Sequence, residues 1–575
     1  MDGRRLRWEP VPPAPARLYE RFPDLPPLFV QVLYARGLTT EAQIRAFLTE
    51  DGASCCSPFE MPGMAEAVQL IRAAITAAMP IAVYGDYDAD GVTATALLTL
   101  TLRSLGAKVI PYIPNRFDEG YGLHEAAIRE LAAQGVRLLL SVDCGIRAEA
   151  EVALARRLGM RVVITDHHHL GERLPPADAV INPRREGTPA PLHHLAGVGV
   201  AYTLAEALLR VERRAPLRGD AAPPEAEALL DLVAVGTVAD LVPLREENRR
   251  LVRLGLRRLN EAPRPGLRAL RLVSGVEGGV DEGTIAYQLA PRLNAAGRLR
   301  DARLALDLLL AEEEREAMAL AEALERLNLE RRRQTRRVQR AAERRVRGIE
   351  PLPPLLFAAD ADWPPGVIGL AAGRLAERFH RPVVIVHKGE EHSVGSCRSP
   401  AHFHITRALE AVSDLLLHYG GHASAAGFTV RTEALPALQA RLMEEAAHGL
   451  EAAAPEPPPL RPDAETALHD LSWDVYHLFQ RLAPFGVGNP PPLLLSRGVH
   501  LVSARAVGKD GDHLKLRLAD GEGNLWDGIA FGQGALAERL GRRVDLAYRL
   551  HRNEWRGRIS LELEIEAIAP SEMQG

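Results

Sequence analysis

Cysteine is scarce in this chain, and its four residues form no recognisable pattern. Cys55, Cys56, Cys144 and Cys397 include no C-x-x-C pair, which argues against a disulfide framework and against a zinc ribbon. No uninterrupted apolar run is long enough to span a bilayer, and the first residues lack the apolar segment of a signal peptide. We therefore expect a protein of a reducing compartment, the cytoplasm.

Lysine is equally scarce, because the 70 basic residues are almost all arginine and lysine occurs only at positions 108, 388, 509 and 515. The net charge of −5 neither favours nor excludes nucleic acid as a partner, since local charge decides that question. The 575 residues are enough for about three or four domains. A hydrophobic content of 47% and a charged content of 25% are those of an ordinary globular protein.

The strongest local signal is V-Y-G-D-Y-D-A-D-G, residues 83–91. A short apolar run, Pro80–Tyr84, predicts a buried strand, and three acids at alternate positions follow it. They are Asp86, Asp88 and Asp90. Carboxylates this crowded repel one another and favour a bound cation. A calcium loop of the EF-hand type explains them less well, because it needs Glu six residues after its Gly, and Leu97 stands there.

Strands and helices alternate from about residue 58 to residue 265, which predicts a parallel sheet covered on both faces. The predicted strands are Ile81–Tyr84, Lys108–Ile113, Arg137–Val142 and Arg161–Thr165. Polar groups just past the carboxyl ends of such strands stand where doubly wound folds place their chemistry.

Acids and histidines follow the later elements of this domain as well. Asp143 comes after the third strand, Asp166, His167 and His168 come after the fourth, and a predicted apolar helix, Leu229–Val238, leads to Asp240. Alone, each has a structural explanation as a helix cap or a satisfied core histidine. Four such clusters at element ends in one domain indicate a site instead.

The residue types of this constellation indicate a divalent-metal site. Mixed carboxylate and imidazole ligands suit Mn²⁺ or Mg²⁺ better than a structural zinc. A bridging carboxylate, here Asp143, would hold two ions about 3.5–4 Å apart, the arrangement that activates water and stabilises charge on phosphorus.

Together, D-Y-D-A-D-G, S-V-D-C-G, T-D-H-H and V-A-D resemble the motifs of the DHH phosphoesterase superfamily, in that family's order. Over nearly its whole length the chain is similar to the single-strand-specific 5′-to-3′ DNA exonucleases of the superfamily. The resemblance implies two Mn²⁺ or Mg²⁺ ions and a catalytic set of ligands: Asp88, Asp90, Asp143, His167, His168 and Asp240. We add Asp86 to the metal-binding candidates; whether Asp86 and Asp166 bind metal or orient ligands stays open.

Two further elements offer groups for a DNA strand. In the loop of residues 114–124, Arg116 and Tyr121 supply charge and an aromatic ring, although an ordinary loop with a helix cap explains them equally. In Q-L-A-P-R-L-N-A-A-G-R-L, three polar residues stand among small ones: Arg292, Asn294 and Arg298. The exonuclease family carries a similar element, which supports a DNA-lining role.

Residues 301–346 predict one uninterrupted helix, rich in Glu and then Arg, that connects two lobes. A solvated face with Glu–Arg pairs explains its arginines better than DNA binding does.

The strand–helix alternation restarts at about residue 351. Gly-rich turns there carry Ser396, Arg398 and His422, and such turns are good anion cradles. Tight turns within a sheet explain the glycines but not the Arg and the His. Gly420-Gly421-His422 resembles an element of the DHHA1 domain that accompanies DHH, and by that resemblance the three polar residues hold the scissile or terminal phosphate.

After a Pro-rich linker near residue 451, five short strands between residues 499 and 568 predict a small barrel of the OB type. Its candidates for gripping a single strand are Arg505, Lys509, Lys515, Trp526 and Phe531. Aromatic residues of a barrel are more often part of its core.

We therefore predict an α/β protein with two lobes built on parallel or mixed sheets, joined by a long helix, and a C-terminal OB-type barrel. The expected parts are an N-terminal arm (1–57) packed on the domain next to it in sequence, a DHH catalytic domain (58–265), a helical connector (266–350), a DHHA1 domain (351–450), and a linker with the barrel (451–575).

The predicted function is that of a 5′-to-3′ exonuclease specific for single-stranded DNA, with direct attack by water. By resemblance alone, it acts in DNA repair and recombination beside a single-strand-binding protein and a repair helicase. One alternative is a phosphodiesterase of short oligonucleotides or cyclic dinucleotides, which would need neither the connector nor the barrel. The other is an inactive DNA-binding scaffold, which should have lost motifs that are intact here.

Overall fold

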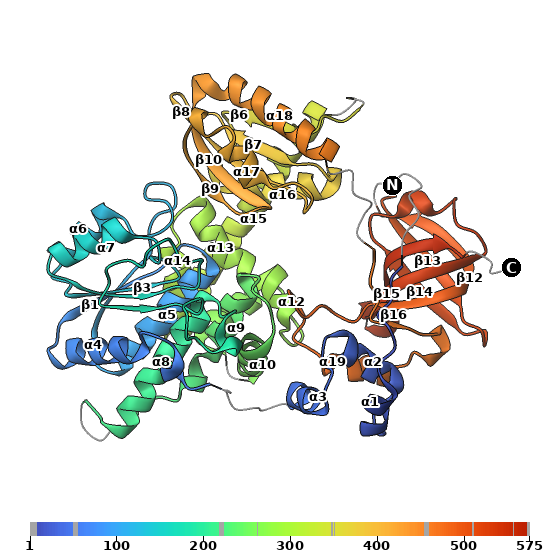
Figure 1. The fold of residues 1–575 in the computed structure, drawn as a ribbon, viewed down its shortest axis with the longest axis horizontal. Helices are drawn as coiled ribbons and strands as arrows, with labels where there is room; N and C mark the ends of the chain where they lie inside the picture. The colour runs from blue at the N-terminus through green and yellow to red at the C-terminus, as the bar shows by residue number, and fades with distance from the viewer. Residues whose placement is uncertain are drawn as a thin grey trace. The chain divides into compact units, whose positions relative to one another are not determined.

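The computed structural model describes residues 8–49, 56–217, 223–261, 263–346, 349, 351–452, 459–508, 511–555 and 557–571. These residues belong to two compact units, drawn as a ribbon in Figure 1. The two-sheet unit comprises Cys56–Val242 and Leu254–Glu456, and the barrel unit comprises Met1–Cys55, Pro243–Arg253 and Pro457–Gly575. Every helix within the described ranges is too short or too polar to cross a bilayer.

The first sheet of the two-sheet unit is parallel throughout, as predicted, with the strand order β2-β1-β3-β4-β5. Its strands are β1 (Pro80–Tyr84), β2 (Lys108–Tyr112), β3 (Leu138–Val142), β4 (Arg161–Thr165) and β5 (Ala179–Ile181). The short β5 was not predicted. Every residue of β3 is buried, so the sheet is covered on both faces.

Helices from both sides cover this sheet. Helices α6 and α7 share one hydrophobic cluster with the strands, while α5 packs against α8 and α9. Their bounds are α4 (Met64–Thr76), α5 (Ala89–Ser104), α6 (Glu125–Ala133), α7 (Glu149–Arg157), α8 (Gly197–Arg214) and α9 (Leu230–Ala239).

The helical segment after this sheet differs from the prediction in one respect. The single helix expected over residues 301–346 is two helices, α14 (Arg303–Leu310) and α15 (Glu314–Val346), because the backbone is extended at Ala311. The break allows the buried leucines of α14 to pack between α5 and α15. Ala and Glu both favour helix, so the composition of residues 311–313 does not reveal the break.

Helix α15 still connects the two sheets, because it packs against α11, α13 and α14 on one side and against α16 on the other. The remaining helices of this segment are α10 (Glu246–Glu261), α11 (Pro265–Val273), α12 (Glu282–Thr284) and α13 (Ala290–Leu299), with a π-helical turn over Ile285–Leu289.

The second sheet is mixed, with the order β6-β7-β8-β10-β9. Only β6 and β7 run parallel, and the other neighbours are antiparallel. The strands are β6 (Leu356–Asp360), β7 (Val383–His387), β8 (His392–Arg398), β9 (Leu416–Gly421) and β10 (Ala425–Arg431), and the helices are α16 (Pro365–Phe379), α17 (Ile405–Glu410) and α18 (Leu435–Ala452). The predicted second lobe is thus confirmed.

The barrel unit contains the predicted C-terminal barrel. Five strands pair in the order β12-β13-β14-β16-β15, with β14 and β16 parallel, and the pairing of β12 with β15 closes the barrel. The short β11 (Ala464–Glu465) pairs in parallel with β12. The five strands are β12 (Leu494–Val507), β13 (His513–Ala519), β14 (Leu525–Ala530), β15 (Arg543–Trp555) and β16 (Arg558–Pro570), preceded by α19 (Trp473–Gln480). Lys509, one of the proposed DNA-gripping residues, lies outside the described residues.

The N-terminal arm packs on the barrel, whereas the prediction placed it on the domain next to it in sequence. Its helices α1 (Ala16–Arg21), α2 (Pro27–Ala35) and α3 (Glu41–Leu48) share one hydrophobic core with the barrel, in which Phe29 and Leu33 join Leu514 and Leu546. The side-chain amide of Gln31 also donates its Nε2 to the backbone carbonyl of Asp463, 3.2 Å away. Burial of these apolar side chains determines the partner, and sequence position carries no information about it.

Candidate metal centre

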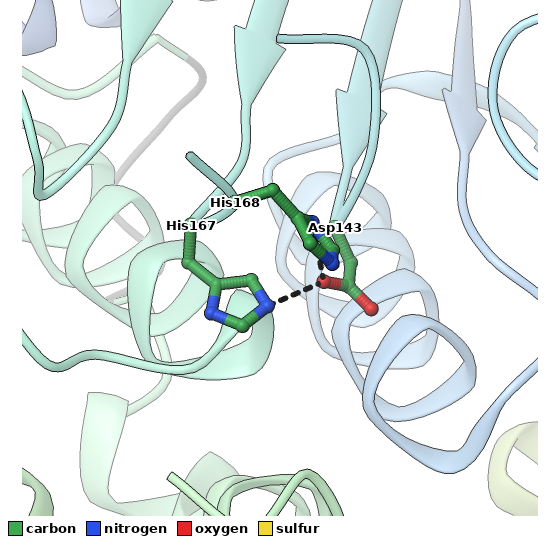
Figure 2. A group of neighbouring side chains, drawn as sticks. All are labelled: Asp143, His167 and His168. Carbon is green, nitrogen blue, oxygen red and sulfur yellow. Dashed lines mark ion pairs between the residues drawn. The ribbon is translucent and has the colours of Figure 1, made fainter. Parts of the chain in front are cut away.

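The carboxyl ends of β1, β3 and β4 and the end of α9 bring all the predicted metal-binding residues together. Three groups of side chains have ligand atoms within 4.8 Å of one another: Asp86–Asp88–Asp143, Asp143–His167–His168 and Asp90–His167–Asp240. Figure 2 shows the second group, in which both histidines face the Asp143 carboxylate. Asp143 belongs to two groups, and it is the residue that the sequence predicted as a bridge.

Asp143 and Asp90 are held by backbone geometry. Asp143 has a positive φ of 60°, a conformation that costs energy for a residue other than glycine and is concentrated at functional sites. Asp90 accepts two hydrogen bonds from the first turn of α8, from the amides of Gly197 (2.7 Å) and Val198 (2.8 Å). Gly197 has to be glycine, because a Cβ there would stand 2.6 Å from Oδ1 of Asp143.

Asp166 orients a histidine and does not itself reach the cluster. Its Oδ1 accepts hydrogen bonds from the backbone amide and from Nδ1 of His168, at 3.0 and 2.8 Å, and its Oδ2 accepts from the amide of Ile146. Burial raises the pKa of Asp166, but the hydrogen bonds from His168 outweigh it and leave the pKa below its usual value. A carboxylate behind a ligating imidazole fixes the ring and its tautomer.

Four buried side-chain atoms of the cluster have no hydrogen-bond partner among the described residues: Asp86 Oδ1, Asp143 Oδ1, His167 Nε2 and Asp240 Oδ2. The His167 nitrogen lies 3.1 Å from Asp143 Oδ1 and 3.6 Å from Asp240 Oδ2, so they point at a common space. Buried polar atoms are normally satisfied, and unpaired ones need an explanation. A divalent cation between them supplies it.

The electrostatics agree with a missing positive charge. Burial and the neighbouring carboxylates raise the pKa of Asp240 to about 9 and that of Asp90 to about 7. Burial, together with the nearby His168, lowers the pKa of His167 to about 4, which keeps its imidazole neutral and able to ligate. Residues and charges therefore fit Mn²⁺ or Mg²⁺.

The loop candidates lie beside this centre. The hydroxyl group of Tyr121 donates to the carbonyl oxygen of Asp143 (3.2 Å) and lies 3.0 Å from Nδ1 of His168, while 48% of the residue stays exposed. The guanidinium group of Arg116 stands over the ring of Tyr87, 5.0 Å from its centroid.

The three candidates on α13 have different surroundings. Asn294 accepts a hydrogen bond from the amide of Ala89 and so holds the first turn of α5. Arg292 is 8% exposed and is paired with Glu325 of α15. Burial and the nearby Arg116 and Arg331 lower the pKa of Arg298 to about 10. Arg298 thus lies among several arginines, with Asp88 as the acid that partly offsets their charge.

Candidates of the second sheet lie at one end of β8 and at the β9–β10 turn. Arg398 donates to the hydroxyl group of Ser396 (3.2 Å), and Gly369 approaches both so closely that a Cβ would stand 2.7 Å from the Ser396 Oγ. The ring of His422 lies 6.5 Å from that of His169, which follows the predicted His pair in the first lobe.

Sequence reasoning missed several supporting residues. Asn182, just past β5, donates to the carbonyl of His168, and the amides of Gly197 and Val198 hold Asp90. The G-V-G at the start of a helix was a usable signal, since helix amino termini bind anions, including carboxylates. Nothing near Asn182 in sequence pointed to the centre.

Comparison with known proteins defines the class first. The chain matches the DHH family, N-terminal domain, over residues 80–237 and the DHHA1 domain over residues 353–448, so the two-sheet unit is that of a DHH phosphoesterase. The barrel matches the RecJ OB domain over residues 462–567.

The chain belongs to the RecJ family. It is 38% identical to the single-stranded-DNA-specific exonuclease RecJ of Bacillus subtilis, over 100% of this chain and 72% of that protein. It is also 38% identical to that of Escherichia coli, over 95% of this chain and 96% of that one. RecJ of Thermus thermophilus in complex with Mn²⁺ superposes with a TM-score of 0.83 and 33% identity, covering 99% of this chain and 80% of that chain. The same protein in complex with Mg²⁺ superposes with a TM-score of 0.76 and 32% identity, covering 99% of this chain and 79% of that chain.

Proposed function

We propose that this chain is a divalent-metal exonuclease that degrades single-stranded DNA from its 5′ end. The observation that carries the proposal is the set of buried, unpartnered carboxylate and imidazole atoms at the strand ends, in a member of the RecJ family. The RecJ relatives are named for this substrate and have been solved with Mn²⁺ and with Mg²⁺. The 5′ polarity is inferred from the family.

The residues that would hold two such ions are Asp86, Asp88, Asp90, Asp143, His167, His168 and Asp240. Two bound ions supply Lewis acidity and a water of lowered pKa for attack on a phosphodiester. The protein's own part is orientation. Asp166 fixes His168, the α8 amides fix Asp90, and the Tyr121 hydroxyl group braces the Asp143 backbone. No Ser or Cys nucleophile is required.

The substrate-binding candidates supply positive charge around this centre. We propose that Arg116, Tyr121, Arg298, Ser396, Arg398 and His422 contact the strand and its phosphates. Arg292 and Asn294 act behind them, because their side chains already bind Glu325 and the first turn of α5. On the barrel, Arg505 stands opposite Lys515 of the neighbouring strand, but the Lys515 ammonium group already binds Glu562, 2.9 Å away. Arg505, which is exposed, and Phe531, which is 58% exposed, are therefore the barrel residues best suited to phosphate and base.

The cellular setting is part of the proposal. Single-stranded DNA arises in repair and recombination, and a single-strand-binding protein and a repair helicase are the expected partners. The free thiols of Cys144 and Cys397 support a reducing compartment, the cytoplasm.

The decisive experiment uses matched single-stranded DNAs labelled at either end, with Mn²⁺, beside Asp143→Ala. We expect mononucleotides released from the 5′ end, and no release by the variant. Cleavage confined to di- to tetranucleotides or cyclic dinucleotides would support the phosphodiesterase alternative. Binding without cleavage would support the inactive scaffold.

A further inference from the structure

A third histidine, His169, follows the two of the metal centre and is exposed, with two arginines beside it. Arg147, from the β3–α7 loop, donates its Nε to the carbonyl of His169, 3.0 Å away. Arg184, just after β5, donates its Nε to the carbonyl of His167, 2.9 Å away. Two separate loops thus bring a guanidinium group to the same short stretch of backbone.

The charged side chains of this group are its two arginines, whose exposed guanidinium groups carry a permanent positive charge. The ring of His422 lies 6.5 Å from that of His169. Other arginines of this unit form ion pairs with acidic side chains: Arg264 with Asp231, and Arg292 with Glu325. Within the described part of the chain, neither Arg147 nor Arg184 forms an ion pair.

The hydrogen bonds of Arg147 and Arg184 to the backbone of residues 167–169 use only part of each guanidinium group. Each arginine uses only Nε for its backbone carbonyl, and among the described residues no acceptor binds the two terminal nitrogens of either one. Both arginines are exposed, so these nitrogens can reach a ligand. Two planar guanidinium groups beside imidazoles suit phosphate oxygens.

We propose that Arg147, Arg184, His169 and His422 form a second phosphate subsite, which binds a phosphate adjacent to the one being hydrolysed. The inference rests on the proposed exonuclease function. Its ligand is either the 5′-terminal phosphate or the next internucleotide phosphate of the strand. The subsite places a neighbouring phosphate without touching the reacting one, so its loss weakens binding of the strand and spares the chemical step.

The test combines protein and substrate changes in a cycle, with Arg147→Gln/Arg184→Gln as the variant and Arg129→Gln as the control. Arg129 is an exposed arginine of the same unit that is paired with Glu125 on α6. The substrates are a 5′-phosphorylated oligonucleotide, its 5′-hydroxyl counterpart, and one with a neutral methylphosphonate at the second linkage. We expect the double variant to raise KM for the first substrate about tenfold, as for two solvent-exposed charge pairs, with kcat unchanged.

The cycle identifies the ligand. With the wild-type protein, KM should be about tenfold higher for the substrate that lacks the bound phosphate than for the 5′-phosphorylated oligonucleotide. With the double variant, removing that phosphate should raise KM no further. If each change of substrate raised KM by the same factor for the double variant as for the wild-type protein, the subsite would be overturned. A fall in kcat on all substrates alike would also overturn it and would make the arginines positioning residues of the metal centre.

A binding measurement separates this inference from the proposed function. In EDTA, where no cleavage occurs, the logarithm of the affinity for single-stranded DNA falls with the logarithm of salt concentration by about 0.7 per phosphate contact. We expect the slope of the double variant to be shallower by about 0.7–1.4 than those of wild type and Arg129→Gln. An unchanged slope contradicts the subsite even if the wild-type protein cleaves no DNA at all.

Discussion

Two buried carboxylates of the two-sheet unit, Asp231 and Asp143, have opposite surroundings. Asp231, 1% exposed on α9, accepts two hydrogen bonds from the guanidinium group of Arg264, at 2.7 and 2.8 Å. Asp143, 3% exposed just after β3, has an Oδ1 for which the described part of the chain provides no hydrogen-bond partner. The chain supplies the counter-charge of the first, and a ligand must supply that of the second.

The comparison shows which observation marks a site. Burial is the same for both carboxylates, and only the satisfaction of the oxygens differs. A charge paired within the protein contributes to the fold, and removing its partner leaves an uncompensated charge. A charge left unpaired destabilises the protein until a cation binds, and the binding energy of that cation is then available for function.

Asp143→Asn tests whether the carboxylate without a protein partner serves the reaction. We expect the rate of Mn²⁺-dependent DNA hydrolysis to fall by about 10³-fold or more, about 4 kcal/mol of transition-state stabilisation. The melting temperature in EDTA should stay the same or rise, because the variant removes a carboxyl group whose ionisation burial and the neighbouring Asp90 and Asp88 carboxylates oppose, raising its pKa. Activity assays and thermal melts with and without Mn²⁺ check both. Full activity, or a lower melting temperature in EDTA, would contradict this assignment.

Arg264→Met tests whether the paired carboxylate, Asp231, contributes to the stability of the fold. Removing one partner of a buried ion pair costs about 3–5 kcal/mol of unfolding free energy, which urea denaturation measures. The rate per folded molecule should remain near that of the wild-type protein. The matched control is Asp231→Leu/Arg264→Met, which should recover most of the stability because no buried charge remains. A double variant as unstable as the single one would show that packing, and not charge, is responsible.

Asp166→Asn sharpens the comparison, since Asp166 is satisfied by the protein and yet serves the centre. We expect a loss of about 10–100-fold in Mn²⁺ affinity, because His168 loses the carboxylate that orients it. A Mn²⁺ titration of the hydrolysis rate measures the affinity, and excess Mn²⁺ should restore the rate. If excess metal fails to do so, Asp166 has a part in the reaction itself.

The last expected effect concerns pH. The pKa values of Asp90 and Asp240 are raised to about 7 and about 9 in the folded protein. The folded state therefore binds protons that the unfolded state has already released, and this stabilisation is lost as pH rises from about 4 to about 9. Melting temperatures in EDTA should fall over this window, and Mn²⁺ should raise them more at pH 9 than at pH 5. Equal stabilisation by Mn²⁺ at both values would contradict these shifts.

The sequence was sufficient to predict that the proposed metal-binding residues gather in one place, because they stand in short contiguous motifs at element ends. D-Y-D-A-D-G follows β1, and the parallel sheet brings it to the same edge as Asp143 and His167. Hydrophobic alternation likewise predicted both sheets and the barrel.

The features that could not be predicted depend on contacts between distant residues. The amides that hold Asp90 come from Gly197 and Val198, more than a hundred positions away, and the pairing of Arg264 with Asp231 joins two helices. The break after α14 follows from packing, which local helix propensity does not record. The partner of the N-terminal arm could not be read for the same reason.

The shared core of the N-terminal helices and the barrel has a consequence during synthesis. Gln31 hydrogen-bonds to Asp463, 432 residues later. At about 5–20 residues per second, a ribosome needs roughly 20–90 s to make the intervening chain. For that time Phe29, Val30 and Leu33 have emerged without the strands that bury them. The nascent chain therefore carries an unburied apolar segment until the barrel is made, and a chaperone that holds such segments would bind it during that time.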